Sequence, residues 1–170
     1  VSDLEPGTSY TYRVGDRSLN LWSDNGTFTT DDGDSKFSFI SIADVQASSD
    51  ENFAHAAETM KGAIKTLPNY EFMVNLGDFV NDCTNDEWNW YFKNFAFANM
   101  NTTIAPVAGN HDGNITNKLN INVFNSMFNL GNPNTESNTN WVNGVYYSFD
   151  YGNAHFAVIN TNDMYPMTQS

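Results

Sequence analysis

Residues 72–78, FMVNLGD, form a short apolar run that ends in Gly77 and Asp78. A run of this length, bounded by polar or turn residues, is typical of a buried strand. The same pattern occurs at residues 36–42, KFSFISI, and at residues 103–107, TIAPV. Polar residues follow soon after each of these runs. The sequence therefore predicts three buried strands that each lead into a polar loop.

The segments around these runs have helical spacing. Residues 53–67 repeat apolar side chains every three or four positions, and residues 86–98 form an aromatic-rich helix candidate. A short helix is expected at residues 121–128, and two last strands at 145–149 and 155–160. Strands that alternate with helices predict an α/β fold around a mainly parallel sheet.

Polar residues that could carry chemistry follow three of the predicted strands. They are Asp44, Asp78, Asn110, His111 and Asp112. Parallel sheets bind ligands at the carboxyl ends of their strands, so we expect these residues to share one site. Carboxylate, carboxamide and imidazole groups suit divalent ions such as Mn, Zn or Fe. Two carboxylates in one crevice repel unless a cation neutralises them. In a two-metal site Asp78, on the middle strand, is the natural bridge.

The first thirty residues follow a different pattern. Alternating residues at 11–14 and 26–30 predict two short strands. The Leu-x-Pro-Gly-Thr-x-Tyr corner at residues 4–10 resembles the end of a fibronectin type III-like sandwich, in which the Tyr10 hydroxyl would bond nearby backbone. Two strands do not form a stable sandwich alone. We therefore expect residues 1–30 to be the end of a domain whose earlier strands lie outside this chain.

Three motifs, each after a predicted strand, carry a resemblance to a known family. They are Asp44-Val45-Gln46, Gly77-Asp78 and Gly109-Asn110-His111-Asp112. In this order they resemble the motifs of the calcineurin-like metallophosphoesterases. With the corner at residues 4–10 before them and a Tyr-Ser-Phe strand at residues 147–149 after them, the chain looks like the purple acid phosphatase branch. The resemblance implies that residues 36–170 are the first half of an αββα sandwich, in which sheets lie between helical layers.

The resemblance also implies roles for the site residues. Asp44 would bind one metal ion, Asp78 would bridge two ions, and Asn110 would bind the second. His111 would contact the phosphate and act as a general acid, and Asp112 would orient it. The cofactors would be two divalent ions (Mn, Zn or Fe), and the nucleophile would be a hydroxide bound to them.

Several positions depart from the family pattern. Gln46 stands where relatives carry histidine or glycine, so we expect a weak ligand or a hydrogen-bonding side chain there. Asn81 stands where the purple enzymes carry the tyrosine that gives their colour, so we expect no purple colour. The family takes further ligands from later histidines, but only His155 follows His111, and its apolar strand predicts a packed structural histidine. We therefore expect this chain to need a C-terminal half and to be inactive without it.

Composition limits the possible partners. The chain of 170 residues has 7 Lys+Arg against 20 Asp+Glu and a net charge of −13, which argues against nucleic-acid binding. No apolar run reaches the roughly 20 residues that span a membrane. The single cysteine, Cys83, excludes an internal disulfide framework. Frequent Asn and scarce Lys favour an extracellular or cell-surface protein.

These observations predict hydrolysis of phosphate esters at a binuclear metal site. Monoesters are preferred because the flanking corner points to the acid phosphatase branch. A phosphodiesterase or nucleotidase is the second enzymatic hypothesis, because a fold does not choose between these substrates. A non-catalytic surface or binding module that has lost a metal site is the alternative from another class. It is supported by Gln46, Asn81 and the missing histidines.

Overall fold

A parallel sheet lies at the centre of the structure, a computed structural model that describes residues 2–113, 122–128, 130 and 146–159. Its strands run in the order β5 (Phe39–Ile42), β6 (Phe72–Asn75) and β7 (Thr103–Pro106). All four residues of β6 are buried. A middle strand covered on both faces explains why the consecutive residues Phe72, Met73 and Val74 are all apolar rather than alternating with polar ones.

Two long helices connect these strands, and each begins with a polar cap. Helix α1 (Asp50–Thr66) starts after Ser49, whose side chain accepts a hydrogen bond from the backbone of the first turn. Helix α2 (Asn85–Asn99) starts after Thr84, which forms a reciprocal capping box with Glu87. Both caps place the helix starts earlier than the apolar spacing predicts, because the first turn of each helix is polar.

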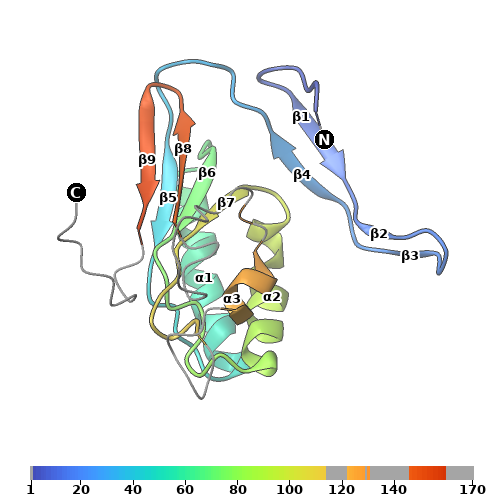
Figure 1. Cartoon of the computed structure of the whole chain (residues 1–170), viewed down its shortest axis with the longest axis vertical. Coiled ribbons are helices and arrows are strands. Elements are labelled where there is room, and N and C mark those ends of the chain that lie inside the picture. Colours follow the sequence, from blue (N-terminus) through green and yellow to red (C-terminus); the bar gives the residue numbers. More distant parts are fainter. Residues whose placement is uncertain (1, 114–121, 129, 131–145, 160–170) are drawn as a thin grey trace, which may run out of the picture.

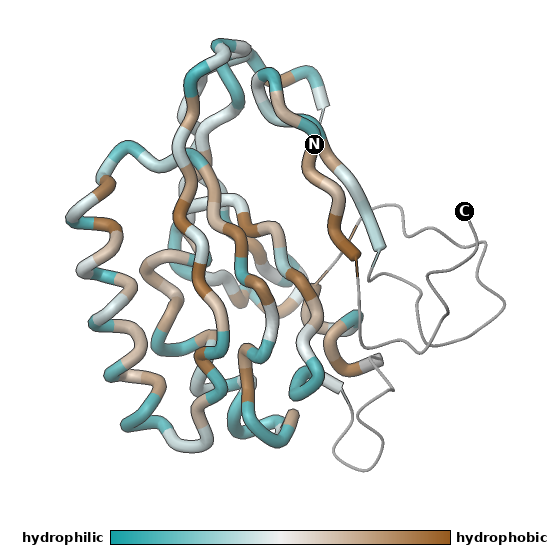
Figure 2. The backbone as a smooth tube through the Cα atoms, turned by 90° about the vertical axis from the view of Figure 1, so that its left-hand side faces the viewer, coloured by the Kyte–Doolittle hydropathy of each residue, from teal (hydrophilic) through white to brown (hydrophobic). Residues whose placement is uncertain are grey.

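The helices cover one face of the sheet (Figure 1). Helix α3 (Asn122–Met127) lies against α2 and adds Phe124 to the same core. This core is rich in aromatic side chains that are almost completely buried. They are Phe53, Phe79, Trp88, Tyr91, Phe95 and Phe124. Figure 2 shows hydrophobic residues spaced along the strands and the helices of this part, with hydrophilic residues in the connecting turns.

A β-hairpin covers the other face of the sheet. It consists of β8 (Tyr147–Tyr151) and β9 (Ala154–Val158), which pair antiparallel. The Phe72 ring of β6 lies 5.9 Å from the Phe149 ring and 5.5 Å from the Phe156 ring, measured between centroids. The described part therefore has three layers, namely helices, parallel sheet and hairpin, in a mixed α/β fold.

His155 corrects one prediction from the sequence. Ala154, Phe156 and Val158 of β9 face inward, and a strand alternates its side chains, so His155 points to the outer face. There its Nδ1 lies 2.7 Å from a carboxylate oxygen of Asp150, and its side chain is exposed. The prediction of a packed histidine was wrong because the apolar neighbours lie on the opposite face of the strand.

The N-terminal segment forms a long hairpin that extends away from the other elements (Figure 1). Strands β1 (Ser9–Tyr12) and β4 (Gly26–Thr29) pair antiparallel. The hairpin continues through the short pair β2 (Gly15–Asp16) and β3 (Leu21–Trp22), which lies between the two strands predicted from the sequence. Neither of these two-residue strands has an apolar pattern long enough to be recognised.

Tyr10 makes the contact that the corner motif predicts. Its hydroxyl accepts a hydrogen bond from the backbone N–H of Glu5 at 2.9 Å. The hairpin joins the other elements near Met100, whose carbonyl accepts from the N–H of Thr27 at 2.9 Å and from the hydroxyl of Tyr12 at 3.2 Å. Within the described residues this hairpin pairs with no further strand, so the fibronectin type III-like origin of residues 1–30 stays a prediction. In the same described part, no helix is both long and apolar enough to cross a membrane.

Candidate functional site

The loops that follow β5 and β6 are joined by backbone hydrogen bonds. The N–H of Asp44 donates to the carbonyl of Gly77 at 3.1 Å, and the N–H of Gln46 donates to the carbonyl of Asp78 at 2.8 Å. Asp44, Gln46 and Asp78 have φ values of 53°, 38° and 53°. This left-handed conformation is strained for residues other than glycine, and such strain clusters at functional sites. The strained backbone therefore marks the loops after β5 and β6 as candidates for the functional site.

Two glycines let the loops after β6 and β7 approach each other. A Cβ atom on Gly109 would lie 2.1 Å from Oδ1 of Asp78 and 2.2 Å from its backbone nitrogen. A Cβ atom on Gly77 would lie 2.8 Å from the Cα of Gly109, and Gly77 also has a φ of 101°. Only glycine fits this close backbone contact. The glycines of both motifs are therefore part of the site's construction.

The carboxylate of Asp112 connects the same two loops. Its Oδ2 accepts hydrogen bonds from the N–H groups of Asp78 at 2.9 Å and Gly109 at 2.8 Å. Its Oδ1 accepts from the N–H groups of Phe79 at 2.8 Å and Val80 at 3.4 Å. Asp112 is completely buried. This side chain therefore satisfies backbone donors that would otherwise be buried without partners.

Burial raises the pKa of Asp112 to about 6, and the nearby Asp78 carboxylate adds to this effect. The hydrogen bonds from Gly109, Phe79 and Val80 act in the opposite direction, because they stabilise the charged form. Asp112 is thus a buried acid held by the backbone.

His111 is fixed at its backbone and at both ring nitrogens. Its N–H donates to Oδ1 of Asp78 at 2.9 Å. Its Nδ1 bonds the backbone carbonyl of Asn81, and its Nε2 lies 2.9 Å from the amide nitrogen of Gln46. The ring is therefore held by Asn81 and Gln46, and within the described residues no hydrogen bond joins it to the Asp112 side chain.

The structure brings most of the predicted site residues to one edge of the sheet. Asp44, Asp78, His111 and Asp112 are connected by the contacts above, and Asn110 lies between Gly109 and His111 in the same loop. Asp78 and Asp112 are buried, whereas the side chains of Asp44 and Asn110 are exposed. The roles of these residues stay predictions.

Two further residues reach the site. The sequence marked Gln46 only as a departure from the family pattern, without a partner for its amide. Asn81 contributes its backbone carbonyl to His111, and a main-chain contact leaves no signal in residue type. The contacts of Gln46 and Asn81 with His111 follow from how the loops pack, which the sequence alone does not show.

Comparison with known proteins shows the family to which this chain belongs. The family model of the calcineurin-like phosphoesterases matches residues 37–169. The chain belongs to this family. The fold is also similar to the solved structure of purple acid phosphatase PPD1 from yellow lupin (Lupinus luteus) seeds, with a TM-score of 0.69 and 17% sequence identity. That match covers 92% of this chain and 31% of the lupin chain, so this chain spans about a third of that protein's length. A search of curated proteins found no match.

The family match confirms the resemblance read from the three motifs and the mixed α/β metallophosphoesterase-type fold. Identity to the lupin phosphatase is low, so that likeness concerns the fold alone.

The donor chemistry of the site fits a divalent metal ion, but the number of donors is small. Asp44, Asp78 and Asn110 offer hard oxygen ligands. Asp78 accepts the N–H of His111 with Oδ1, and no described residue hydrogen-bonds its Oδ2. Within the residues described, no group of three or more His, Cys, Asp or Glu side chains is placed to hold a metal ion. These three side chains could supply part of the ligands of a metal centre, but they are too few to hold two ions by themselves.

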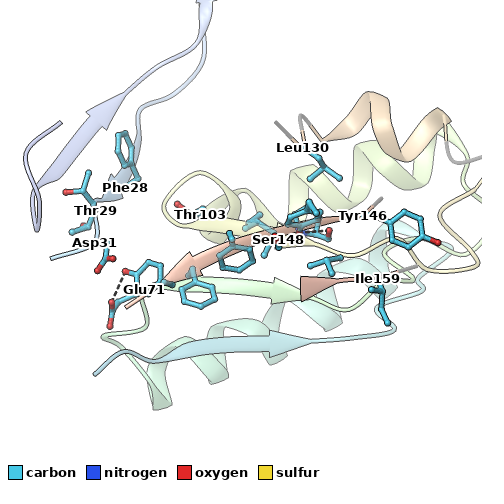
Figure 3. A pocket seen from close by; sticks show the side chains of 18 residues that line it. Phe28, Thr29, Asp31, Glu71, Thr103, Leu130, Tyr146, Ser148 and Ile159 are labelled. Carbon is cyan, nitrogen blue, oxygen red and sulfur yellow. Dashed lines mark hydrogen bonds between the residues drawn. The ribbon is translucent and has the colours of Figure 1, made fainter. Parts of the chain in front are cut away.

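A cavity of about 940 Å³ lies elsewhere in the molecule (Figure 3). It runs along β7 and the β8–β9 hairpin, with Phe28 and Asp31 of the N-terminal segment at one end and Tyr146 and Ile159 at the other. None of the predicted site residues lines it. Apolar pockets are the usual starting hypothesis for a binding site. Here the motif residues lie outside that cavity, at the carboxyl ends of the strands.

Proposed function

We propose that this phosphoesterase family member hydrolyses phosphate esters with two divalent metal ions (Mn, Zn or Fe), and that it prefers monoesters. The observation that carries the proposal is the meeting of three strand-end loops. Backbone bonds join the Asp44 and Asp78 loops, and the bond from the His111 N–H to Asp78 joins the third. Family membership supports metal-dependent phosphoester chemistry at this edge of the sheet.

The residues that would hold the ions are Asp44, Asp78 and Asn110, with Asp78 between the two others in the order of the sheet. Bound ions would neutralise the carboxylates, polarise a phosphoryl oxygen and lower the pKa of a water molecule. Further ligands would have to come from residues outside the described part. We therefore propose that a C-terminal portion of the protein completes the centre.

The chain's own residues would orient and bind the ester. His111 would contact the phosphate, because its ring is already held in place beside the Asp78 loop. Asp112 would keep the Gly77-Asp78 and Gly109 loops in register through its buried carboxylate. A preorganised loop pair lowers the cost of placing a substrate between fixed groups.

One observation favours a second candidate, a non-catalytic binding module. The described residues offer too few ligands for two ions, and Gln46, at a position where many relatives carry histidine, faces His111. We favour the enzyme because Asp78, Asn110 and His111 keep the residue types that the family pattern requires.

Two further parts of the proposal concern the rest of the molecule. The Tyr10 contact supports a fibronectin type III-like origin for residues 1–30. The scarcity of Lys and the abundance of Asn support an extracellular or cell-surface location. Detection of the full-length protein in the medium or at the cell surface would test this location, and retention inside the cell would contradict it.

Hydrolysis assays on the full-length protein test the proposed activity. The protein would be loaded in turn with Mn, Zn or Fe and supplied with one phosphomonoester and one phosphodiester of the same leaving group. We expect the monoester to be cleaved faster, and we expect Asn110→Ala to reduce cleavage of both. Faster cleavage of the diester would replace the monoester assignment with the phosphodiesterase hypothesis. Absence of cleavage with every metal would favour the binding module.

A further inference from the structure

The contacts of the His111 ring define a single tautomer. Nδ1 faces the backbone carbonyl oxygen of Asn81, which can only accept a hydrogen bond. The proton of the neutral ring therefore sits on Nδ1. Nε2 then carries the lone pair and accepts from the Gln46 amide nitrogen at 2.9 Å. Since one ring nitrogen sets the state of the other, the two contacts support each other.

The Gln46 amide is itself held in one orientation. Its nitrogen lies 2.9 Å from Nε2 of His111 and 3.5 Å from the side-chain oxygen of Asn81, and both of these partners accept hydrogen bonds. The backbone N–H of Gln46 is also fixed, because it donates to the carbonyl of Asp78 at 2.8 Å. The side chain therefore starts from a fixed point on the loop after β5 and reaches across to the loop after β7.

We propose that Gln46 is a positioning residue for His111: its amide N–H donates to Nε2 and fixes the orientation of the ring, whose Nδ1–H tautomer is set by the Asn81 carbonyl. This assigns Gln46 to the imidazole rather than to a metal ion. The catalytic consequence rests on the proposed phosphoesterase function, whereas the tautomer does not. A ring that is already oriented needs no further ordering when a phosphate ester binds, so loss of Gln46 slows the reaction without weakening substrate binding.

Nitrogen NMR of the metal-free, full-length protein with labelled histidine tests the assignment directly. The two ring nitrogens of each tautomer give distinct signals, and a His111→Gln variant identifies those of His111 by their disappearance. The spectrum is recorded at mildly alkaline pH. We expect a proton on Nδ1 and a lone pair on Nε2. A neutral ring with its proton on Nε2 would overturn the inference without any variant.

Three variants separate the role of Gln46 from its surroundings. Gln46→Met keeps the length of the side chain but removes the amide, and we expect the Nε2 signal of His111 to move towards that of a lone pair without a hydrogen-bond donor. Gln46→Glu places an acceptor opposite Nε2, and we expect a proton to appear there. Asn81→Ala keeps the backbone carbonyl and removes only the 3.5 Å contact, so we expect the wild-type tautomer. Identical His111 spectra in the wild type, Gln46→Met and Gln46→Glu would overturn the inference.

Kinetics supply the second readout. With an ester that the loaded enzyme cleaves, we expect Gln46→Met to lower kcat about tenfold and to leave KM within about twofold, because a ring that is no longer oriented reaches the reacting geometry less often. His55→Gln, an exposed change on α1, serves as the control with unchanged kinetics. A changed His111 spectrum in Gln46→Met, with no hydrolysis in any sample, would reject the proposed function and keep the positioning role. Wild-type kcat in Gln46→Met would overturn the catalytic consequence of that role.

Discussion

Replacement of Asp112 by alanine would remove a buried acceptor that joins the loops after β6 and β7. Three backbone N–H groups lie 2.8–2.9 Å from its carboxylate, those of Asp78, Phe79 and Gly109. A buried donor without a partner costs about 1–3 kcal/mol, which gives roughly 3–9 kcal/mol for the three. This loss is partly offset, because the variant no longer buries a charge.

The size of that offset follows from the raised pKa of Asp112. Burial raises the pKa from 3.8 to about 6, and each pKa unit corresponds to about 1.36 kcal/mol, so the ionised group costs about 3 kcal/mol at neutral pH. We subtract this offset from the middle of the range for the lost hydrogen bonds. The expected net loss in the free energy of unfolding for Asp112→Ala at about pH 7 is therefore about 3 kcal/mol. Such a loss is a large part of the stability of an ordinary domain.

The pH dependence has a definite sign. The folded protein binds the Asp112 proton more tightly than the unfolded chain, so this group's contribution to stability is complete below about pH 4 and declines as the pH rises through about 6. The alanine variant lacks this decline. The difference between wild type and variant is therefore larger at about pH 4 than at about pH 7, by up to about 3 kcal/mol.

Urea unfolding of the metal-free, full-length protein at both pH values, followed by tryptophan fluorescence, measures this difference. Trp88 is buried in the helical core, so its emission reports unfolding of this part. Asp86→Ala, an exposed carboxylate at the start of α2, is the matched control and is expected to change stability little. Equal stability of Asp112→Ala and wild type, or a difference that grows towards neutral pH, would refute the reasoning.

Three other predictions concern the site and its supports. Gly109→Ala places a Cβ atom 2.1 Å from the Asp78 carboxylate, so we expect a loss of at least about 2 kcal/mol by urea unfolding, and a loss below about 0.5 kcal/mol would contradict the close contact. Thr84→Ala removes the capping box of α2 and is expected to cost about 0.5–2 kcal/mol in the same assay, whereas Ser18→Ala, in the exposed N-terminal hairpin, leaves α2 unchanged. With Asn81 in place of the colour-giving tyrosine, we expect no purple absorption band after loading with iron, and a visible band in the wild type would show that this expectation is wrong.

The sheet was predictable because its signal is local. Residues 72–78 carry an apolar run and its polar end together, and β6 with Asp78 follows that pattern. The short strands β2 and β3 were not predictable, because two residues in a polar segment carry no periodicity. The burial of His155 was mispredicted because apolar neighbours in a strand do not say which face a residue occupies.

The candidate site was predictable in its residues and less so in its contacts. Asp44, Asp78 and His111 stand out because they follow strands, and parallel strands end at a common edge. Asp112 accepts from backbone N–H groups, which almost every residue has, so the residue types around it do not predict this role. The contact between Gln46 and His111 joins residues 65 positions apart, and it follows only from the way the loops pack.

Metal content tests the central claim most directly. The full-length protein, its Asp78→Ala variant and the control Asp86→Ala would be loaded with Mn or Zn, freed of excess metal and measured by elemental analysis. The account predicts about two ions per wild-type and control molecule, with a sharp fall in Asp78→Ala. No bound metal in the wild type, or equal metal in all three proteins, would contradict a metal centre built on Asp78.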